Sequence, residues 1–169
     1  MFRARRTVLS LALAASAVVL GACASLPSTD EMRQEVAGFE LPKLPEDGKA
    51  IVYVVRPSPL GPLIRFNVFI DDQEATSEMG WNRGAQYFYF NLEPGTRKIF
   101  SQAENLAEIE VKAAAGDVIV IQQHTNMGFI MARNSLQALE LDPTGKYYIK
   151  TLSPGTTLRR DKAGPEIKQ

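Results

Sequence analysis

Residues Ile51-Val-Tyr-Val-Val-Arg56 form a continuous run of β-branched and aromatic side chains, and this run decides the fold of the chain. Such a run favours a β-strand covered on both faces, because a strand with one face in water alternates apolar and polar residues. The next residues, Pro57-Ser-Pro-Leu-Gly-Pro62, end the strand, since proline cannot donate to a sheet hydrogen bond. The sequence therefore predicts a strand buried on both sides, followed by a turn.

Further strand patterns, separated by turn residues, follow on the C-terminal side of this run. In residues 107–112 apolar side chains alternate with charged ones, which is typical of a strand with one face in water. No helical pattern of twelve residues occurs between positions 50 and 152, so we predict an all-β domain, an antiparallel β-sandwich of seven to nine strands. The other candidate strands are residues 66–70, 86–91, 97–102 and 118–121, with a weaker one at 129–132.

Turn residues stand between these candidate strands. Glu93-Pro-Gly-Thr96 has proline and glycine at the central positions of a type II turn, so we predict a positive φ at Gly95. Asp142-Pro-Thr-Gly145 predicts another turn, which would join a strand at 136–141 to one at 147–151.

The N-terminal segment has the parts of a bacterial export signal. Three arginines within the first six residues precede an apolar run of 13 residues, from Val8 to Leu20. Gly21 and Ala22 then precede Cys23, the only cysteine of the chain. This arrangement resembles a lipoprotein signal, which implies cleavage before Cys23 and a covalent lipid on that residue.

Two alternatives to lipidation are open. A membrane-spanning helix needs about 20 consecutive apolar residues, and this run is shorter. An ordinary secretory signal would leave one free thiol in an oxidising compartment. In lipoproteins, a residue such as Ala24 after the cysteine implies sorting to the outer membrane, so we expect the protein to face the periplasm.

These patterns divide the chain into four segments: a signal peptide at 1–22, a lipidated N-terminus and tether at 23–49, a sandwich at 50–152 and a disordered tail at 153–169. Within the tether, Ser28-Thr-Asp-Glu31 resembles a capping box, so either a short helix or a disordered segment fits. As a flexible coil, the tether would span roughly 25 to 30 Å.

The charge of the chain argues against nucleic acid as a partner. The full sequence has 19 basic and 19 acidic residues. Three basic residues leave with the signal, so 16 remain and the net charge of the mature chain is about −3. Because no basic stripe stands out against the acids, we expect no nucleic acid as a partner. The expected partner is the membrane, reached through the lipid anchor.

Four short stretches of sequence within the predicted sandwich together resemble an exported β-sandwich family, the domain of unknown function 2846. The resemblance extends over residues 50–152 and implies a β-sandwich within a bacterial lipoprotein. Because the shared motifs are strands and turns, it implies no reaction and no catalytic residue. The segments are Ile51-Val-Tyr-Val-Val-Arg56, Asn67-Val-Phe-Ile-Asp71, Leu92-Glu-Pro-Gly-Thr96 and Ala115-Gly-Asp117.

The titratable residues have structural interpretations. His124 is the only histidine, which excludes a metal site made of several histidines, and a solvated or hydrogen-bonded side chain is the simpler interpretation. Asp71 and Asp72 could form a cation site with the nearby Glu74, but they stand where a hairpin turn needs turn-forming residues, so we favour the turn. The sequence therefore predicts no catalytic residue, no metal and no cofactor other than the lipid.

The acidic pair Glu108 and Glu110 lies two residues apart on one strand, so both side chains share its wet face. Lys112 continues the same face. Solvation therefore explains the pair better than an acid and a base acting together.

Tyr87-Phe-Tyr-Phe90 is the most suggestive surface segment. The two tyrosines share one strand face and the two phenylalanines the other. If the phenylalanines enter the core, Tyr87 and Tyr89 point outward, near Trp81 and Arg83 of the preceding Gly-Trp-Asn-Arg-Gly loop. We predict a patch there that binds a glycan, a peptide or another envelope protein. Alternatively, neighbouring strands or the tether cover both faces.

Two functions of different classes follow. The favoured one is a lipid-anchored envelope protein that acts as a non-enzymatic interaction or structural module. The other is a periplasmic hydrolase or transferase whose site is assembled from scattered residues. The sequence favours the first, because no motif places a nucleophile, a base and an orienting group together.

Overall fold

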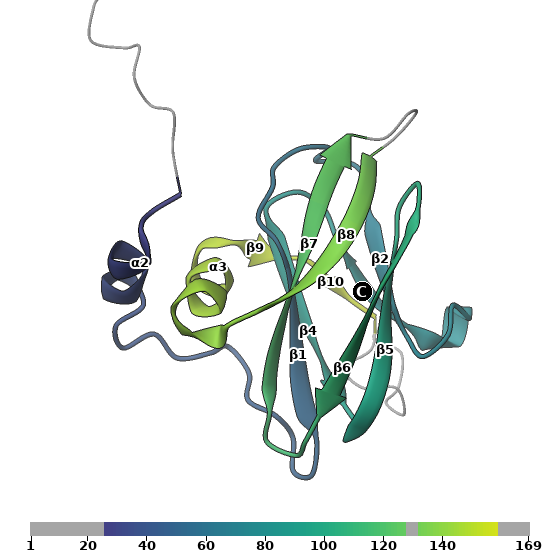
Figure 1. The fold of residues 1–169 in the computed structure, drawn as a ribbon, viewed down its shortest axis with the longest axis horizontal. Helices are drawn as coiled ribbons and strands as arrows, with labels where there is room; N and C mark the ends of the chain where they lie inside the picture. Colours follow the sequence, from purple (N-terminus) through teal and green to yellow (C-terminus); the bar gives the residue numbers. More distant parts are fainter. Residues whose placement is uncertain (1–25, 128–131, 159–169) are drawn as a thin grey trace, which may run out of the picture.

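Two five-stranded sheets make up the described part of the chain, residues 26–127 and 132–158 of a computed structural model (Figure 1). Sheet A has the order β8-β7-β1-β4-β9 and sheet B the order β10-β3-β2-β5-β6. Within these residues, eight strands have five or more residues, which confirms the predicted all-β sandwich. The strands are β1 (Ala50–Arg56), β2 (Phe66–Ile70), β3 (Glu78–Asn82), β4 (Gln86–Leu92), β5 (Gly95–Gln102), β6 (Leu106–Ala113), β7 (Val118–Met127), β8 (Ala132–Leu139), β9 (Ser153–Pro154) and β10 (Thr156–Thr157). The helical elements are α2 (Thr29–Glu35), η2 (Ala75–Ser77), η3 (Leu141–Gly145) and α3 (Lys146–Thr151).

Strand β1 lies in the middle of sheet A, and all seven of its residues are buried. It pairs antiparallel with β4 and parallel with β7. Sheet A is therefore mixed, although the neighbouring strands of sheet B all run antiparallel. The prediction of a strand covered on both faces is confirmed.

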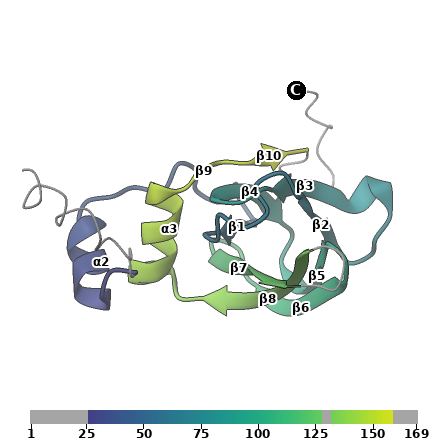
Figure 2. The ribbon, with the colours of Figure 1, turned by 90° about the horizontal axis from the view of Figure 1, so that it is seen from above.

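Two groups of buried apolar side chains cover the two faces of β1. The inner cluster lies between the sheets, and the outer cluster lies on the other face of sheet A, under α3 and residues 39–41. Figure 2 shows α3 beside sheet A, with α2 on the far side of α3. The inner cluster is Ala50, Val52, Val54, Val68, Ile70, Met79, Phe88, Phe90, Leu92, Ile99, Val111, Ala113 and Ile121. The outer cluster is Ile51, Tyr53, Val55, Tyr87, Val120, Tyr148 and Ile149.

The expected capping box is present and begins helix α2. The Ser28 side chain accepts a hydrogen bond from the Glu31 amide, and the Glu31 carboxylate accepts one from the Ser28 amide at 2.7 Å. Gly38, with φ of +75°, follows the helix. Met32 and Val36 are buried, so residues 26–49 pack on the domain and do not form the flexible coil that composition allowed.

The C-terminal part of the domain differs from the prediction. Residues 146–151 form α3 and not a strand, because Tyr148 and Ile149 bury their side chains against the outer face of β1 and β7. Tertiary packing there outweighs the strand propensity of these residues. Residues 153–157 form β9 and β10, which pair with β4 and β3, so this part of the predicted disordered tail is ordered. Residues 159–169 lie outside the described part.

Residues 80–82, the first three of the expected loop, belong to β3, and only Arg83 and Gly84 lie in the connection to β4. Gly80 has a φ of +149° and lets the Thr156 carbonyl of β10 approach where a side chain would stand. Gly95, with φ of +132°, confirms its predicted positive φ. The weak strand candidate at 129–132 lies mostly outside the described residues, and β8 begins at Ala132.

Candidate functional site

The tyrosines of β4 do not form the predicted surface patch. Phe88 and Phe90 enter the inner cluster, which places Tyr87 and Tyr89 on the opposite face as expected. That face is covered, and Tyr87 is only 8% exposed. The Tyr53 ring lies 6.3 Å from the ring of Tyr87 and 5.3 Å from that of Tyr89, between centroids. These tyrosines are therefore packing residues of the outer cluster.

Trp81 and Arg83 are not neighbours of those tyrosines on one surface. Trp81 is half-buried in β3 of sheet B, where it pairs with Thr156, and the Arg65 guanidinium stacks 4.6 Å from its ring centroid. Arg83 follows β3 at the end of the sheet, where its amide donates to the Gln86 side chain at 2.8 Å. Tyr87 and Tyr89 lie on a covered face of sheet A, Trp81 lies in sheet B and Arg83 lies in the connection after β3, so the predicted patch is not formed.

The remaining candidate residues have structural partners. His124 lies between two glutamines of sheet A, with Nδ1 3.2 Å from Gln122 Nε2 and Nε2 3.0 Å from Gln137 Oε1. The Asp71 carboxylate accepts two bonds from the Arg97 guanidinium, the shorter at 2.6 Å. Asp71 also has φ of +65°, which suits the turn that the sequence predicted.

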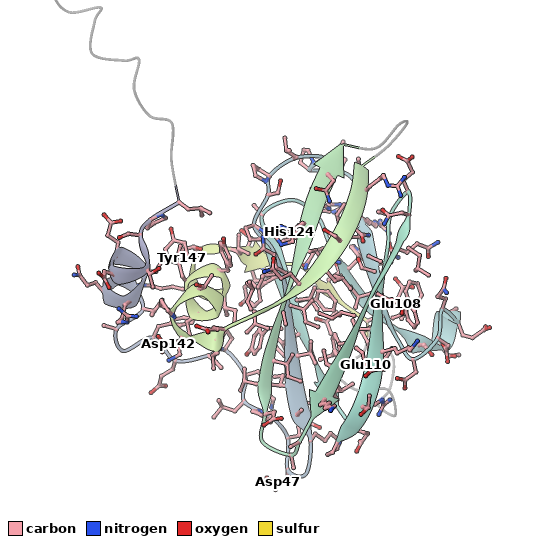
Figure 3. All side chains as sticks on the ribbon, in the orientation of Figure 1. Asp47, Glu108, Glu110, His124, Asp142 and Tyr147 are labelled. Atoms are coloured by element: carbon pink, nitrogen blue, oxygen red, sulfur yellow. The ribbon has the colours of Figure 1, made fainter. Side chains whose placement is uncertain are left out.

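Glu108 and Glu110 are exposed on β6, far from His124 (Figure 3). Lys98 lies 3.7 Å from Glu108, across the β5 and β6 pairing. Within the described residues, no three histidine, cysteine, aspartate or glutamate side chains gather as metal ligands would.

Arg56 is the residue that sequence reasoning missed. It ends β1 on the inner side of sheet A and is fully buried. Its guanidinium donates to the carbonyl oxygens of Ile64 at 2.7 Å and Leu60 at 2.8 Å, while Nε donates to the Thr125 hydroxyl at 3.2 Å. The Phe66 ring lies 3.7 Å from Cζ. Burial lowers the pKa of Arg56 to about 10, because water no longer stabilises the charge.

A buried polar network extends from Arg56 across both sheets. The Asn82 carbonyl accepts from Arg56, and the Asn82 amide group donates to Val54 O at 3.0 Å and to Gln123 Oε1 at 3.1 Å. Gln123 in turn donates to the Ser101 hydroxyl at 2.9 Å. Because these bonds join sheet A to sheet B, they fix the alignment of the two sheets at this end.

We call this part of the sandwich the Arg56 end; it comprises residues 57–65, 83–85, 103–106 and 132–133. The connection from β1 to β2 crosses it, and Arg56 holds that loop from below. Leu60 and Leu63 point away from the protein and are 60% and 85% exposed. The Arg56 end therefore presents apolar side chains on a loop that a buried guanidinium holds in place.

The sequence contained a signal for this arrangement. A charged residue closes an otherwise apolar strand, and the following segment has three prolines and three large apolar residues in place of a polar turn. An arginine that must be buried with its strand needs acceptors, and a proline-rich loop without a carboxylate offers its carbonyl oxygens.

A hollow on the surface lies between α2 and α3. Its volume is about 400 Å³, and it is lined by Leu26, Pro27, Glu31, Glu35, Tyr147 and Thr151. Hydrogen bonds from Ser28 lower the pKa of Glu31, so its carboxylate stays charged. The hollow is a mixed surface of one leucine, one tyrosine and two acids, next to the start of the described chain.

Comparison with known proteins shows one distant relative and no family. The chain is 25% identical over 151 residues to an uncharacterized protein of Haemophilus influenzae, a match that covers 89% of this chain and 83% of that protein. No family model matches the chain. Among the described helices, none has the length and apolar character that crossing a membrane requires.

Proposed function

We propose that this chain is a lipid-anchored protein of the outer membrane, acylated on Cys23 and facing the periplasm, whose sandwich is a non-enzymatic interaction or structural module. The observation that carries the proposal is Leu20-Gly-Ala-Cys23 at the end of an export signal. Because residues 1–25 lie outside the described part, structural support comes from the residues that follow them. The resemblance to the domain of unknown function 2846 agrees with this proposal and stays a prediction.

The packing of residues 26–49 supports a short and direct anchor. Lys150 of α3 binds Glu35 of α2 at 2.8 Å, and the Lys43 amide donates to the Tyr53 hydroxyl at 2.9 Å. These contacts hold residues 26–49, which the sequence predicted to be a tether, against the domain. The three steps from Cys23 to Leu26 span at most about 11 Å, since an extended residue covers roughly 3.6 Å. An acylated Cys23 would therefore hold the sandwich against the membrane.

The described residues support a binding role for the sandwich better than a catalytic one. Both ring nitrogens of His124 are within hydrogen-bond distance of glutamine side chains, and the Asp71 carboxylate is held by Arg97. These side chains serve the sheets and turns in which they lie. The Arg56 end instead offers exposed leucines in a fixed arrangement, which suits recognition of an apolar surface. The partner class is therefore the membrane itself or another envelope component.

The anchor is tested by substituting its acceptor. We expect Cys23→Ser to lose the acyl groups and to leave the membrane fraction or accumulate as uncut precursor, whereas the matched control Ser25→Ala keeps both lipid and location. Membrane fractionation and the mass of the N-terminal peptide measure this. Ala24→Asp should move the protein to the inner membrane. An intact chain from Met1 to Gln169 in the membrane of the unmutated strain would overturn the proposal.

The non-enzymatic role has its own test. We expect His124→Ala to fold and to complement a deletion strain fully, because the imidazole makes only side-chain contacts within sheet A. Loss of complementation by a folded, membrane-bound His124→Ala protein would instead favour a hydrolase or transferase.

A further inference from the structure

The exposed large apolar side chains of the described residues are concentrated at the Arg56 end. There are five such residues, and three of them belong to this end. Leu60 and Leu63 lie on one loop, and Leu63 is the most exposed of the five. The five are Leu26, Leu44, Leu60, Leu63 and Leu106.

Strand pairing places Leu106 beside that loop. The Arg56 guanidinium stacks on Phe66, so the start of β2 lies at the same end as the last residue of β1. Asn67 pairs with Gln102 on β5, and Gln102 pairs with Leu106 on β6. The loop and the start of β6 therefore place three leucines at the same end of the sandwich.

The two ends of the sandwich carry opposite charge. In the described segments of the Arg56 end, Arg65, Arg83 and Arg133 outnumber Glu104. The opposite end, at residues 44–49, 93–94 and 114–117, is acidic, and Asp47 marks it in Figure 3. Its charged residues are Glu46, Asp47, Glu93 and Asp117, with Lys49 as the single cation of these segments.

Five of the nine residues of the apolar loop have no backbone N–H or have it paired within the loop. Pro57, Pro59 and Pro62 have no N–H group. The Leu60 amide donates to the Ser58 hydroxyl at 3.3 Å, and the Ile64 amide donates within the loop at 3.0 Å.

Three carbonyl oxygens of the loop are bonded from inside the protein. Leu60, Gly61 and Ile64 all accept from the Arg56 guanidinium, the longest of these bonds being 3.4 Å. An irregular loop normally cannot enter hydrocarbon, because its unpaired backbone groups would lose their hydrogen bonds to water. In this loop the three prolines and the bonds from Arg56 remove or pair about half of these groups, which lowers that penalty.

The described chain starts on the side to which the Arg56 end points. In Figure 1, β7 points toward the top of the view, and the chain enters α2 from the same direction. Leu26 begins that entry and is 65% exposed. The chain between Leu26 and the predicted lipid on Cys23 spans at most about 11 Å, and Leu26 lies on the side of the molecule to which the Arg56 end points.

We infer that the Arg56 end is a second membrane contact, in which Leu60, Leu63 and Leu106 enter the phospholipid leaflet that carries the anchor. The inference rests on the proposed lipid anchor. The flanking arginines meet anionic headgroups, and the acidic end points away from the membrane. Arg56 serves as the positioning residue of the loop, and the outcome is a sandwich with one fixed orientation.

The absence of a competing thiol gives a direct experiment. In the lipidated full-length protein Cys23 is acylated, so Leu63→Cys introduces the single reactive thiol, which is labelled with an environment-sensitive fluorophore. Thr96→Cys, exposed beside Gly95 at the acidic end, is the matched control. The labelled proteins are reconstituted into vesicles of phosphatidylethanolamine and phosphatidylglycerol. We expect the Leu63 label to shift to the blue and to be quenched by spin-labelled lipid, while the Thr96 label stays water-like.

Flotation of the vesicles separates the possible failures. If the protein floats and the Leu63 label stays water-like, the membrane contact is overturned while the anchor stands. If the protein does not float, the anchor fails and this inference fails with it. If the label is shielded in whole cells but stays in water on vesicles, the loop binds an envelope protein, and the lipid occupant is overturned.

Discussion

The inner and outer clusters cover opposite faces of β1 and β4 but are built from different side chains. The inner cluster consists of aliphatic residues and phenylalanines from both sheets, with one methionine. The outer cluster contains three tyrosines, Tyr53, Tyr87 and Tyr148, and its cover comes from the ends of the domain. Desolvation raises the pKa of each of these tyrosines. A sandwich can therefore have a second core wherever chain termini fold back onto a sheet.

The difference predicts two levels of stability. The inner cluster joins strands distributed over the whole domain, so it should open only in global unfolding. The outer cluster is covered by α3 and by the segment between α2 and β1, and α2 packs beside α3. We expect these elements to exchange their amide hydrogens through local opening, well below the global free energy of unfolding.

The largest expected effect is in the inner cluster. Phe90→Ala removes a fully buried ring and should lower the free energy of unfolding by about 3 to 5 kcal/mol, through lost burial and a residual cavity. Chemical denaturation measures the loss. Tyr89→Ala on the same strand is the control, since that side chain is only partly buried. Equal losses for the two variants would mean that the two clusters contribute equally to the free energy of unfolding.

The next effect concerns the polar end of the inner cluster. Arg56→Met keeps the length of the side chain but removes the donor to the carbonyl oxygens of Leu60, Ile64 and Asn82, so we expect a loss of about 2 to 3 kcal/mol. Arg97→Met, which breaks a half-exposed ion pair with Asp71, should cost less than about 1 kcal/mol. Hydrogen exchange in residues 57–65 should rise in the first variant only. An unchanged loop would show that Arg56 does not position it.

The outer cluster is tested through its buried hydroxyl. Tyr53→Phe removes two bonds to the backbone of Lys43, so we expect a loss of about 1 to 2 kcal/mol and faster exchange around residue 43. Tyr147→Phe is the control for removing a tyrosine hydroxyl at the less buried margin of the same cluster.

Tyr53 also predicts a dependence on pH. Burial raises its pKa to about 12 from 10, so between these values the folded protein keeps a proton that the unfolded chain has lost. The contribution is complete below pH 10 and disappears as pH rises toward 12. Denaturation midpoints measured across this range should fall less steeply for Tyr53→Phe. An identical slope in the variant would contradict the assignment.

The smallest effect concerns the docking of α2. Lys150→Met removes the bond to Glu35, an exposed pair worth about 0.5 kcal/mol, so global stability should hardly change. Amide exchange in α2 should nevertheless increase. Lys146→Met on the same helix is matched, because Lys146 pairs with Asp142 and not with α2. Equal exchange in the two variants would show that the salt bridge does not hold α2.

The sequence predicted the strands whose pattern is local. β1 and β6 followed from continuous and alternating hydrophobicity, and the positive φ of Gly95 followed from its turn. In each case the neighbouring residues contain the information. β3 was missed because Gly80 and the Arg83-Gly84 pair after the strand resemble a loop, although Gly80 is there to admit β10.

The errors about function share one cause. Tyr87 and Tyr89 alternate correctly with the phenylalanines, but what covers their face is α3 and the segment around Phe39, nearly fifty residues or more away in the chain. No local pattern reports such a cover. Arg56 was missed for a related reason, since its acceptors are mostly backbone carbonyls, and only the prolines and apolar residues after it indicate them in the sequence.

The place of β1 between β4 and β7 has a consequence for the order in which the sheets can form. Ile51 pairs with Val118, sixty-seven residues later, and β9 adds its short edge to β4 only at residue 153. A chain delivered from its N-terminus thus cannot complete sheet A until nearly all of it has been delivered. Such distant pairing slows folding. If the chain is exported as proposed, sheet A would therefore be completed late, when the last strands arrive.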